Sequence, residues 1–258
     1  MQIVPGRASA SSPAAVLIAS PEAGWPQFRG PRRDGICDER GLLQSWPEGG
    51  PALLWSATGV GRGFSSPIFA GGRLYLTGDF GEELRILAFD LQGKPLWRVS
   101  NGAAWLNQYQ GARASVTYSA GRLYHENAHG RVACFDADSG RERWAVDLLQ
   151  RFRGENITWG LSDCLLVDER AVYATAGGRD ALLVALDKTT GDVRWRSEPM
   201  FDTEGEASLE NAGYAPPILV RFAGRRLLVG CSLRHLFCAD ADTGKIQWTR
   251  RRPTSYSV

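Results

Sequence analysis

One pattern repeats four times along this 258-residue chain and constrains its fold more than any other feature. Each copy has a small residue, a spacer and an aspartate, then a polar turn that ends in glycine, and then a tryptophan. The clearest copy runs from Ala185 to Trp195 and reads A-L-D-K-T-T-G-D-V-R-W. The glycine precedes the tryptophan by four residues in every copy, in the pairs Gly93 and Trp97, Gly140 and Trp144, Gly191 and Trp195, and Gly244 and Trp248. A fixed period of roughly 40–50 residues is typical of architectures in which each unit packs on its neighbours.

Each copy divides into four short segments with strand character. The aspartate-to-glycine stretch is typical of a hairpin turn, because aspartate accepts hydrogen bonds from backbone amides and glycine adopts a positive φ without steric cost. Four antiparallel strands per unit predict an all-β fold, a β-propeller of four-stranded blades. The predicted blades span approximately residues 56–97, 112–144, 162–195 and 214–248. Trp55 lies 42 residues before Trp97 and predicts one extra strand from an incomplete copy.

The repeated tryptophans have a packing reason. A lone four-stranded sheet has two faces to bury, and stacking the blades face to face buries them. We expect each indole to fill a hollow at the small residue of a neighbouring blade, namely Ala88, Cys134, Ala185 and Cys238. A buried tryptophan covers about 150–250 Å², which contributes several kcal/mol. The predicted docking residues are Trp55, Trp97, Trp144, Trp195 and Trp248. The alternative is that these rings only fill the cores of their own sheets.

The stretch from Ala185 to Trp195 resembles the tryptophan-docking motif of the pyrroloquinoline-quinone (PQQ) repeat at every fixed position. The other copies match in part, with departures at Gly93, Ser139 and Lys245. The sequences W-P-Q-F-R-G-P at 25–31 and F-S-S-P at 64–67 also resemble PQQ-binding-like β-propeller proteins of bacteria. The resemblance covers about residues 25–250. It implies a quinoprotein-like propeller and, since these proteins are mostly exported, a periplasmic or secreted location.

The number of blades departs from the family pattern. Such propellers usually close with seven or eight blades, whereas this chain supplies about four and an extra strand. We therefore expect an open partial propeller from a fragment or a truncated gene product, with a complete small propeller as the alternative. Residues 25–258 are expected to form a single domain. Residues 1–24 are expected to be a flexible leader, and their apolar piece at 14–19 is too short for a convincing signal peptide.

Charge and hydropathy exclude several functions. The chain has 30 Lys and Arg against 28 Asp and Glu, a net charge of +2, so no strong field attracts nucleic acid. The chain contains no stretch of 18 apolar residues, so the sequence predicts no transmembrane segment. We expect a monomer with a protein or polymer ligand and no nucleic-acid partner.

Two patterns suggest metal or redox chemistry, and neither is convincing. The segment from His125 to His129 reads H-E-N-A-H and matches the zinc-protease motif H-E-x-x-H, but it falls on a predicted strand and turn instead of a helix. The five cysteines are Cys37, Cys134, Cys164, Cys231 and Cys238. None forms a C-x-x-C pair, and Cys231 and Cys238 either form a disulfide across a hairpin or face each other as thiols. We expect no metal site.

The resemblance raises PQQ with calcium as a cofactor. Quinoprotein dehydrogenases add a Ca²⁺ site of Glu, Asn and Asp, a catalytic Asp and adjacent cysteines. No two cysteines are adjacent here, no haem-attachment C-x-x-C-H is present, and the calcium ligands have no matched positions. We therefore expect no cofactor and assign no catalytic residue.

The loops that lead into the first strand of each blade are the best candidates for a binding site. In a propeller these loops gather on one face, and loops on a rigid scaffold often carry binding residues. Each one mixes glycine with an aromatic, Arg or Asn side chain, which suits a polar ligand, a sugar or a peptide. The candidates are Arg62, Phe64, Tyr109, Arg113, Asn156, Trp159, Asn211 and Tyr214. The alternative is that they only line a central channel. Leu148 to Phe152 is expected to add a helical turn there.

Two functions follow from the sequence. The first is a non-catalytic, exported binding or scaffold module that engages a protein or polymer through its loop face or its blade edges. The second is a relative of PQQ-dependent alcohol or sugar dehydrogenases.

Overall fold

Residues 2–5, 24–202 and 208–252 are described by the structure, a computed structural model. Most of the predicted leader, residues 1 and 6–23, lies outside the described residues, as do 253–258 at the end of the predicted domain. The predicted leader contributes one described strand, β1 (Gln2–Pro5), which pairs antiparallel with β2 (Trp55–Thr58). No helix within the described residues is long and apolar enough to cross a membrane.

Four antiparallel sheets of four strands dominate the fold, and in each one the strands lie in chain order. The first sheet contains β3 (Ile68–Ala70), β4 (Arg73–Phe80), β5 (Glu83–Asp90) and β6 (Pro95–Ala103). The second contains β7 (Thr117–Ser119), β8 (Arg122–Glu126), β9 (Arg131–Asp136) and β10 (Glu142–Asp147). The third contains β11 (Leu166–Val167), β12 (Ala171–Gly178), β13 (Ala181–Asp187) and β14 (Val193–Arg196). The fourth contains β17 (Ile218–Phe222), β18 (Arg225–Cys231), β19 (His235–Asp240) and β20 (Ile246–Arg251).

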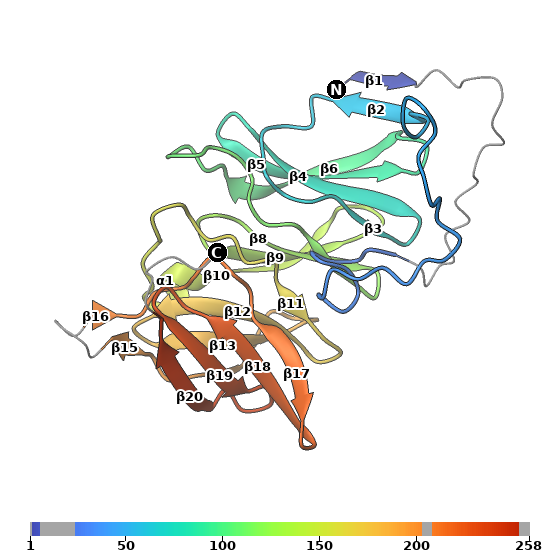
Figure 1. The fold of residues 1–258 in the computed structure, drawn as a ribbon. Helices are drawn as coiled ribbons and strands as arrows, with labels where there is room; N and C mark the ends of the chain where they lie inside the picture. Colours follow the sequence, from blue (N-terminus) through green and yellow to red (C-terminus); the bar gives the residue numbers. More distant parts are fainter. Residues whose placement is uncertain (1, 6–23, 203–207, 253–258) are drawn as a thin grey trace.

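The sheets follow one another as an open arc, with the first sheet at the top of Figure 1 and the fourth at the bottom. The predicted all-β, open partial propeller with four blades is confirmed. Two small additions flank the third sheet: the pair β15 (Phe201–Asp202) and β16 (Ser208–Leu209), and the predicted helical turn, α1 (Leu148–Phe152). The Asp147 side chain caps α1 by accepting a hydrogen bond from the amide of Gln150.

The core lies between the sheets. One cluster joins the first and second sheets, a second joins the second and third, and a third joins the third and fourth. The inner sheets are therefore buried on both faces, and every residue of β12 is buried. In the fourth sheet, burial along β18 alternates with partial exposure instead, because its outer face meets solvent.

Four of the five predicted docking tryptophans contact the glycine turn of the next sheet along the arc. The Trp97 indole covers Gly140, where a Cβ atom would lie 2.7 Å from the ring, and its Nε1 donates to the carbonyl of Ala137 at 3.2 Å. The same arrangement joins Trp55 to Gly93, Trp144 to Gly191 and Trp195 to Gly244. A β-bulge accompanies the tryptophan in all four sheets and sets the direction of its side chain.

The predicted position of the hollow was wrong. Ala88 is the cross-strand partner of Trp97 in the same sheet, and Cys134, Ala185 and Cys238 pair in the same way with their own tryptophans. The indole instead lies on the glycine of the neighbouring sheet, since a residue with φ near +70° and no Cβ leaves a bare backbone surface. Trp248 has no neighbouring sheet and is 46% exposed.

All five cysteines are free thiols. The predicted disulfide or facing thiols of Cys231 and Cys238 are both wrong. Cys231 pairs with Leu236 and Cys238 pairs with Val229 across the β18–β19 ladder. The two thiols therefore occupy different rungs of the ladder and do not face each other.

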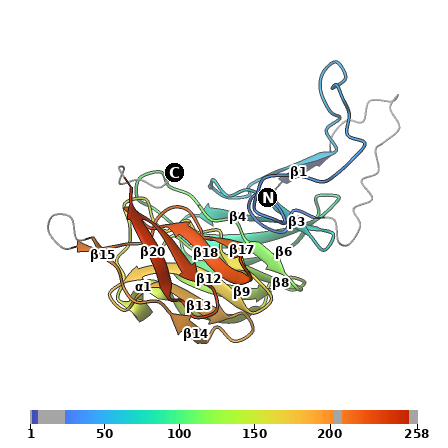
Figure 2. The ribbon, with the colours of Figure 1, turned by 60° about the horizontal axis from the view of Figure 1, so that its bottom comes forward.

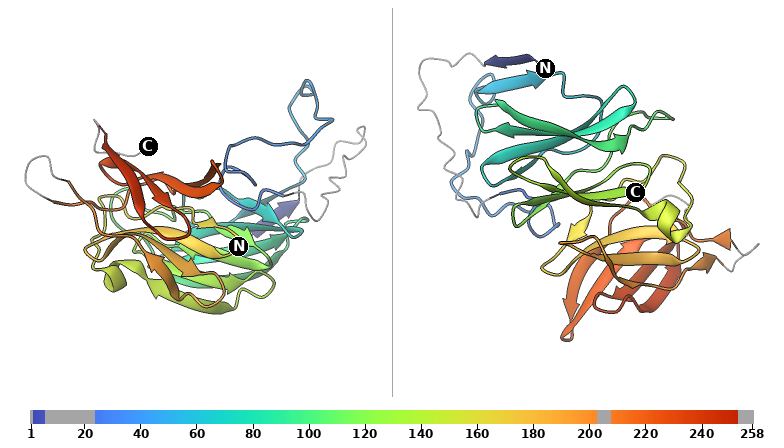
Figure 3. Two further views of the ribbon diagram at one scale, coloured as in Figure 1. Left: turned by 90° about the horizontal axis from the view of Figure 1, so that it is seen from below. Right: turned by 180° about the vertical axis from the view of Figure 1, so that it is seen from behind.

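The segment that precedes the first sheet lies across the first strands of three sheets. Trp25 exchanges two backbone hydrogen bonds with Phe69, and the carbonyl of Pro26 accepts one from the amide of Tyr118. The buried Arg33 guanidinium donates to the carbonyls of Cys164 and Leu165. Residues 34–49, by contrast, are exposed and extend away from the sheets (Figures 2 and 3).

Candidate functional site

The loops that lead into the first strands meet at one end of the strands. The first two loops pair directly: the amide of Phe64 donates to the carbonyl of Ala112 at 2.7 Å, and the amide of Ala112 donates to the carbonyl of Arg62 at 3.0 Å. Since the loops precede β3 and β7 and the first strands of the sheets run the same way, their side chains share one face of the arc. We call this the loop face.

Arg113 joins three of these loops. Its Nε donates to the carbonyl of Trp159, and its Nη1 donates to the carbonyl of Tyr109 at 2.8 Å. The guanidinium also lies 6.0 Å from the ring centre of Phe64 and 5.3 Å from that of Trp105, within range of cation–π attraction. These contacts fix the charged group among aromatic rings.

Aromatic side chains continue from Arg113 across the loop face. Tyr109 meets Trp159 edge-on at 6.3 Å, and the Trp159 and Tyr214 rings lie 5.3 Å apart. The Tyr214 hydroxyl accepts a hydrogen bond from the amide of Trp159 at 3.3 Å. Phe64 and Tyr109 are 65% and 68% exposed, so the surface is both aromatic and accessible. We call Phe64, Tyr109, Arg113, Trp159 and Tyr214 the loop-face cluster.

The three other predicted residues make separate contacts. Arg62 donates to the side-chain oxygen of Gln110 at 2.8 Å. Asn156 donates to the carbonyl of Ala128 at 2.9 Å, and the backbone carbonyl of Asn211 accepts from the amide of Leu233 at 3.1 Å. The structure therefore brings together five of the eight predicted residues and places these three beside them, on the loops that support the cluster.

The H-E-x-x-H segment does not direct its two imidazoles to a common point. His125, at the end of β8, bonds through Nδ1 to the Asn101 amide at 2.8 Å and through Nε2 to the carbonyl of Ala114 at 3.2 Å. His129, in the following turn, bonds to the carbonyl of Ala104 at 3.0 Å. Burial lowers the pKa of His125 to about 4, so this ring is neutral and serves the packing of the loops.

A buried pair of carboxyl groups was missed by the sequence reasoning. Glu126 and Asp163 are both almost fully buried, and none of their carboxyl oxygens has a hydrogen-bond partner within 3.5 Å. Burial raises the pKa of Asp163 to about 6, against the opposing influence of Thr175 and Arg33. Burial, with Asp163 nearby, also raises the pKa of Glu126 well above its usual value. Both residues border apolar runs in the sequence, which is the only local signal of their burial.

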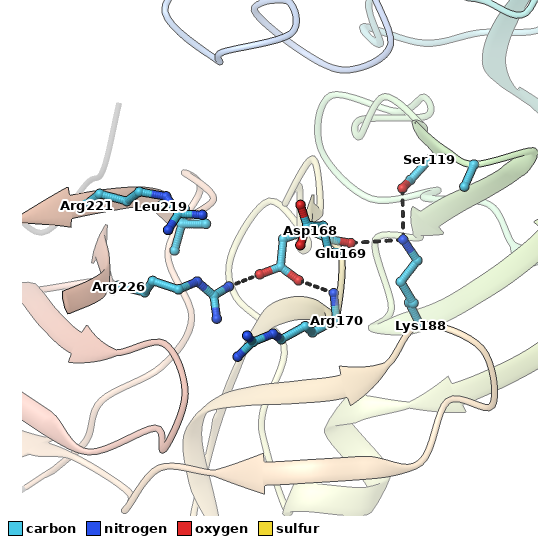
Figure 4. A pocket seen from close by; sticks show the side chains of 9 residues that line it. Ser119, Asp168, Glu169, Arg170, Lys188, Leu219, Arg221 and Arg226 are labelled. Carbon is cyan, nitrogen blue, oxygen red and sulfur yellow. Dashed lines mark hydrogen bonds and ion pairs between the residues drawn. The ribbon is translucent and has the colours of Figure 1, made fainter. Parts of the chain in front are cut away.

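A second feature that the sequence did not reveal is a cavity of about 450 Å³ at the opposite end of the strands (Figure 4). It is formed by the turns at the ends of β7 and β11, by strands β17 and β18, and by the glycine turn of the third sheet. Its lining is mainly charged: Asp168, Glu169, Arg170, Lys188, Arg221 and Arg226, with Ser119, Ala120 and Leu219.

A family model described as "Outer membrane protein assembly factor BamB" matches residues 82–254, which is 173 of the 258 residues. The chain belongs to this family. The predicted membership of a PQQ-like propeller repeat family is thereby confirmed, because the matched model describes PQQ-type repeats.

Curated relatives of this member of the BamB-type family include two quinone-dependent enzymes. One is the 1-butanol dehydrogenase (quinone) of Thauera butanivorans, 28% identical over 170 residues, and the other is the quinoprotein ethanol dehydrogenase of Pseudomonas aeruginosa, 28% identical over 173 residues. Each match covers 60% of this chain but 25% of the relative. The chain thus spans about a quarter of the length of both relatives.

A solved structure supports the fold. The quinohemoprotein alcohol dehydrogenase from Comamonas testosteroni superposes with a TM-score of 0.60 at 16% identity, covering 92% of this chain and 42% of that chain. At this identity the likeness shows a shared propeller arrangement of the blades and nothing about the reaction.

The quinone named in these relatives allows a test of fit. The described residues contain no group of three or more His, Cys, Asp or Glu side chains able to hold a metal ion. Glu126 and Asp163 offer two carboxyl groups, but both are buried, and the negative charge of one disfavours ionisation of the other. Within the described residues, these carboxyl groups do not supply the set of acidic ligands that a Ca²⁺ ion beside a quinone would need.

Proposed function

We propose that this chain is a non-catalytic, exported binding scaffold that engages a protein or polymer ligand through its loop face. The loop-face cluster is the observation that carries the proposal. Residues 25–258 act as one domain and as a monomer in this proposal, and the location is periplasmic or secreted. The family description, which names an outer membrane protein assembly factor, supports a protein ligand and an exported location.

The chemistry of the cluster suits a macromolecular ligand. Aromatic and arginine side chains provide most of the binding energy in protein interfaces, because they bury a large area with few rotatable bonds. Arg113 is already held by backbone carbonyls from two loops, so little side-chain entropy is lost when a ligand covers it. The exposed Phe64 and Tyr109 would be the first residues to be covered.

The blade edges offer a second binding surface in this proposal. The outer face of the fourth sheet presents Trp248, which is half exposed, and Phe222 at the end of β17. The loop face remains the principal site, because its aromatic rings contact one another and Arg113.

A PQQ-dependent dehydrogenase is the second candidate function. The two quinone-dependent relatives favour it, although each match covers only a quarter of the relative. Its expected signature is a red-shifted quinone absorbance when PQQ and Ca²⁺ are added, together with dye reduction by 1-butanol. If this signature were observed, the dehydrogenase function would replace the scaffold function.

Site-specific photocrosslinking tests the scaffold proposal. A benzophenone side chain at position 109 is expected to form discrete adducts with a periplasmic protein or polysaccharide fraction, and Phe64→Ala should abolish them. A benzophenone at position 46 is the matched control, because Trp46 is as exposed as Tyr109 but lies in the segment that extends away from the sheets. Adducts that are identical from both positions, or that survive Phe64→Ala, would contradict the proposal.

A further inference from the structure

The charged cavity opposite the loop face is assembled by tertiary structure from three sheets. Ser119 ends β7, Asp168 follows β11, Arg221 lies on β17, and Lys188 lies in the glycine turn of the third sheet. Because these positions lie at the ends of the strands away from the loops, the cavity is a separate site from the loop-face cluster. Its volume of about 450 Å³ is within the range of small-molecule sites.

The acidic residue at the centre of the cavity is already neutralised. One oxygen of Asp168 accepts from the amides of Arg170 and Ala171, at 2.7 and 2.8 Å. The other oxygen accepts from the Tyr173 hydroxyl at 2.9 Å and forms an ion pair with Arg226. Asp168 therefore has no free capacity and serves to position the cationic side chains around it.

Two cationic groups keep unused donors. The Lys188 ammonium donates to the hydroxyl of Ser119 at 3.2 Å and to the carbonyl of Asp168 at 3.0 Å, which leaves its third N–H for a ligand. The Arg221 guanidinium has no acceptor within the part of the chain that the structure describes. Figure 4 shows Arg221 and Lys188 on opposite sides of Asp168, so the cavity has a cationic group at each end.

The rest of the lining indicates an organic ligand. Ala120 and Leu219 add apolar surface to the lining, which inorganic ions do not use. A guanidinium binds a carboxylate through two parallel hydrogen bonds, and an ammonium binds one as a point charge. We propose that this cavity binds a small organic di- or tricarboxylate, with one carboxylate on Arg221 and another on Lys188.

Calorimetric titration of the whole chain with glutarate and tricarballylate tests the site. We expect saturable binding that weakens as the NaCl concentration rises, and no binding of the neutral analogue glutaramide. Arg221→Gln and Lys188→Gln should each weaken binding by about tenfold. Arg98→Gln removes the same charge from an exposed position on β6 outside the cavity and should leave binding unchanged.

A substitution at Glu169 should change the binding affinity in the opposite direction. Its exposed carboxylate lines the cavity and repels an anion, so Glu169→Gln should tighten binding by about two- to fivefold. An unchanged unfolding midpoint for each variant would show that the fold is intact. The proposal is overturned if inorganic phosphate binds as tightly as tricarballylate, if Arg98→Gln weakens binding as much as Arg221→Gln, or if no saturable binding occurs.

Discussion

The Trp144 indole lies against Gly191 of the next sheet, where a Cβ atom would stand 2.7 Å from its ring, and its Nε1 donates to the carbonyl of Lys188 at 3.2 Å. The contact joins residues 47 positions apart and combines an apolar surface with a hydrogen bond that satisfies the buried N–H. Its recurrence between every pair of neighbouring sheets gives the arc a uniform connection.

The first prediction concerns the glycine. Gly191→Ala should lower the free energy of unfolding by about 3 kcal/mol, because the methyl group overlaps the indole and the residue has a φ of +78°. Gly224→Ala is the control, since Gly224 has a similar φ of +75° but open space around it, and should cost only about 1 kcal/mol. Urea unfolding measures the free energy of unfolding of both variants. Equal decreases in the two would show that the contact between Gly191 and the Trp144 ring contributes nothing to stability.

The second prediction concerns the tryptophans at different places in the arc. Trp144 is 9% exposed between two sheets, and Trp144→Ala should cost about 3–5 kcal/mol. Trp248 is half exposed on the last sheet, and Trp248→Ala should cost no more than about 1 kcal/mol. If chemical denaturation showed that Trp248→Ala lowers the free energy of unfolding more than Trp144→Ala does, the proposed role of the indoles as connections between sheets would be wrong.

The third prediction concerns the segment before the first sheet. Arg33→Ala should destabilise the protein by about 2–3 kcal/mol, because the buried carbonyl of Cys164 loses its donor and that of Leu165 keeps only the Thr117 hydroxyl. The neighbouring Arg32 forms only exposed ion pairs, so Arg32→Ala should leave the stability essentially unchanged. Limited proteolysis should cleave residues 24–35 faster in the Arg33 variant alone, and equal cleavage of the two variants would count against an anchoring role.

The fourth prediction concerns the pH dependence of stability. The pKa of Asp163 is raised by burial to about 6 in the folded protein, from 3.8 when unfolded. The folded state therefore holds this proton more tightly, and the free energy of unfolding falls as the pH rises from about 4 to 6. Asp163→Asn cannot ionise and should be more stable than the parent by on the order of 2 kcal/mol at pH 7.5, and equal to it near pH 4.

Thermal unfolding across this pH range checks the sign. His125, whose buried ring has a pKa lowered to about 4, contributes the opposite slope, but it is present in both proteins and cancels in their difference. Arg33 and Thr175 are present in both proteins, whereas the raised pKa of Glu126 falls in the variant because the Asp163 charge is removed. The exposed Glu155→Gln is the control and should show no pH-dependent difference. A stabilisation by Asp163→Asn that is the same at pH 4 and pH 7.5 would refute the explanation.

The sequence determined the local organisation of this protein, because strands and hairpin turns depend on residues that are close in the chain. The aspartate, glycine and tryptophan spacing defined four blades, and the mixture of glycine and aromatic residues marked Phe64, Tyr109 and Trp159 as loop residues. That spacing also gave an open arc, since too few copies are present to close a ring.

Only the tertiary structure decided which groups meet across sheets. The indole contacts a glycine one sheet away instead of the small residue predicted, because that contact depends on how the faces stack and not on spacing within a blade. The burial of Asp163 beside Glu126, and the cavity between Lys188 and Arg221, arise in the same way. Each joins residues from different blades, and the spacing of a repeat along the chain does not determine which individual side chains meet when the blades stack.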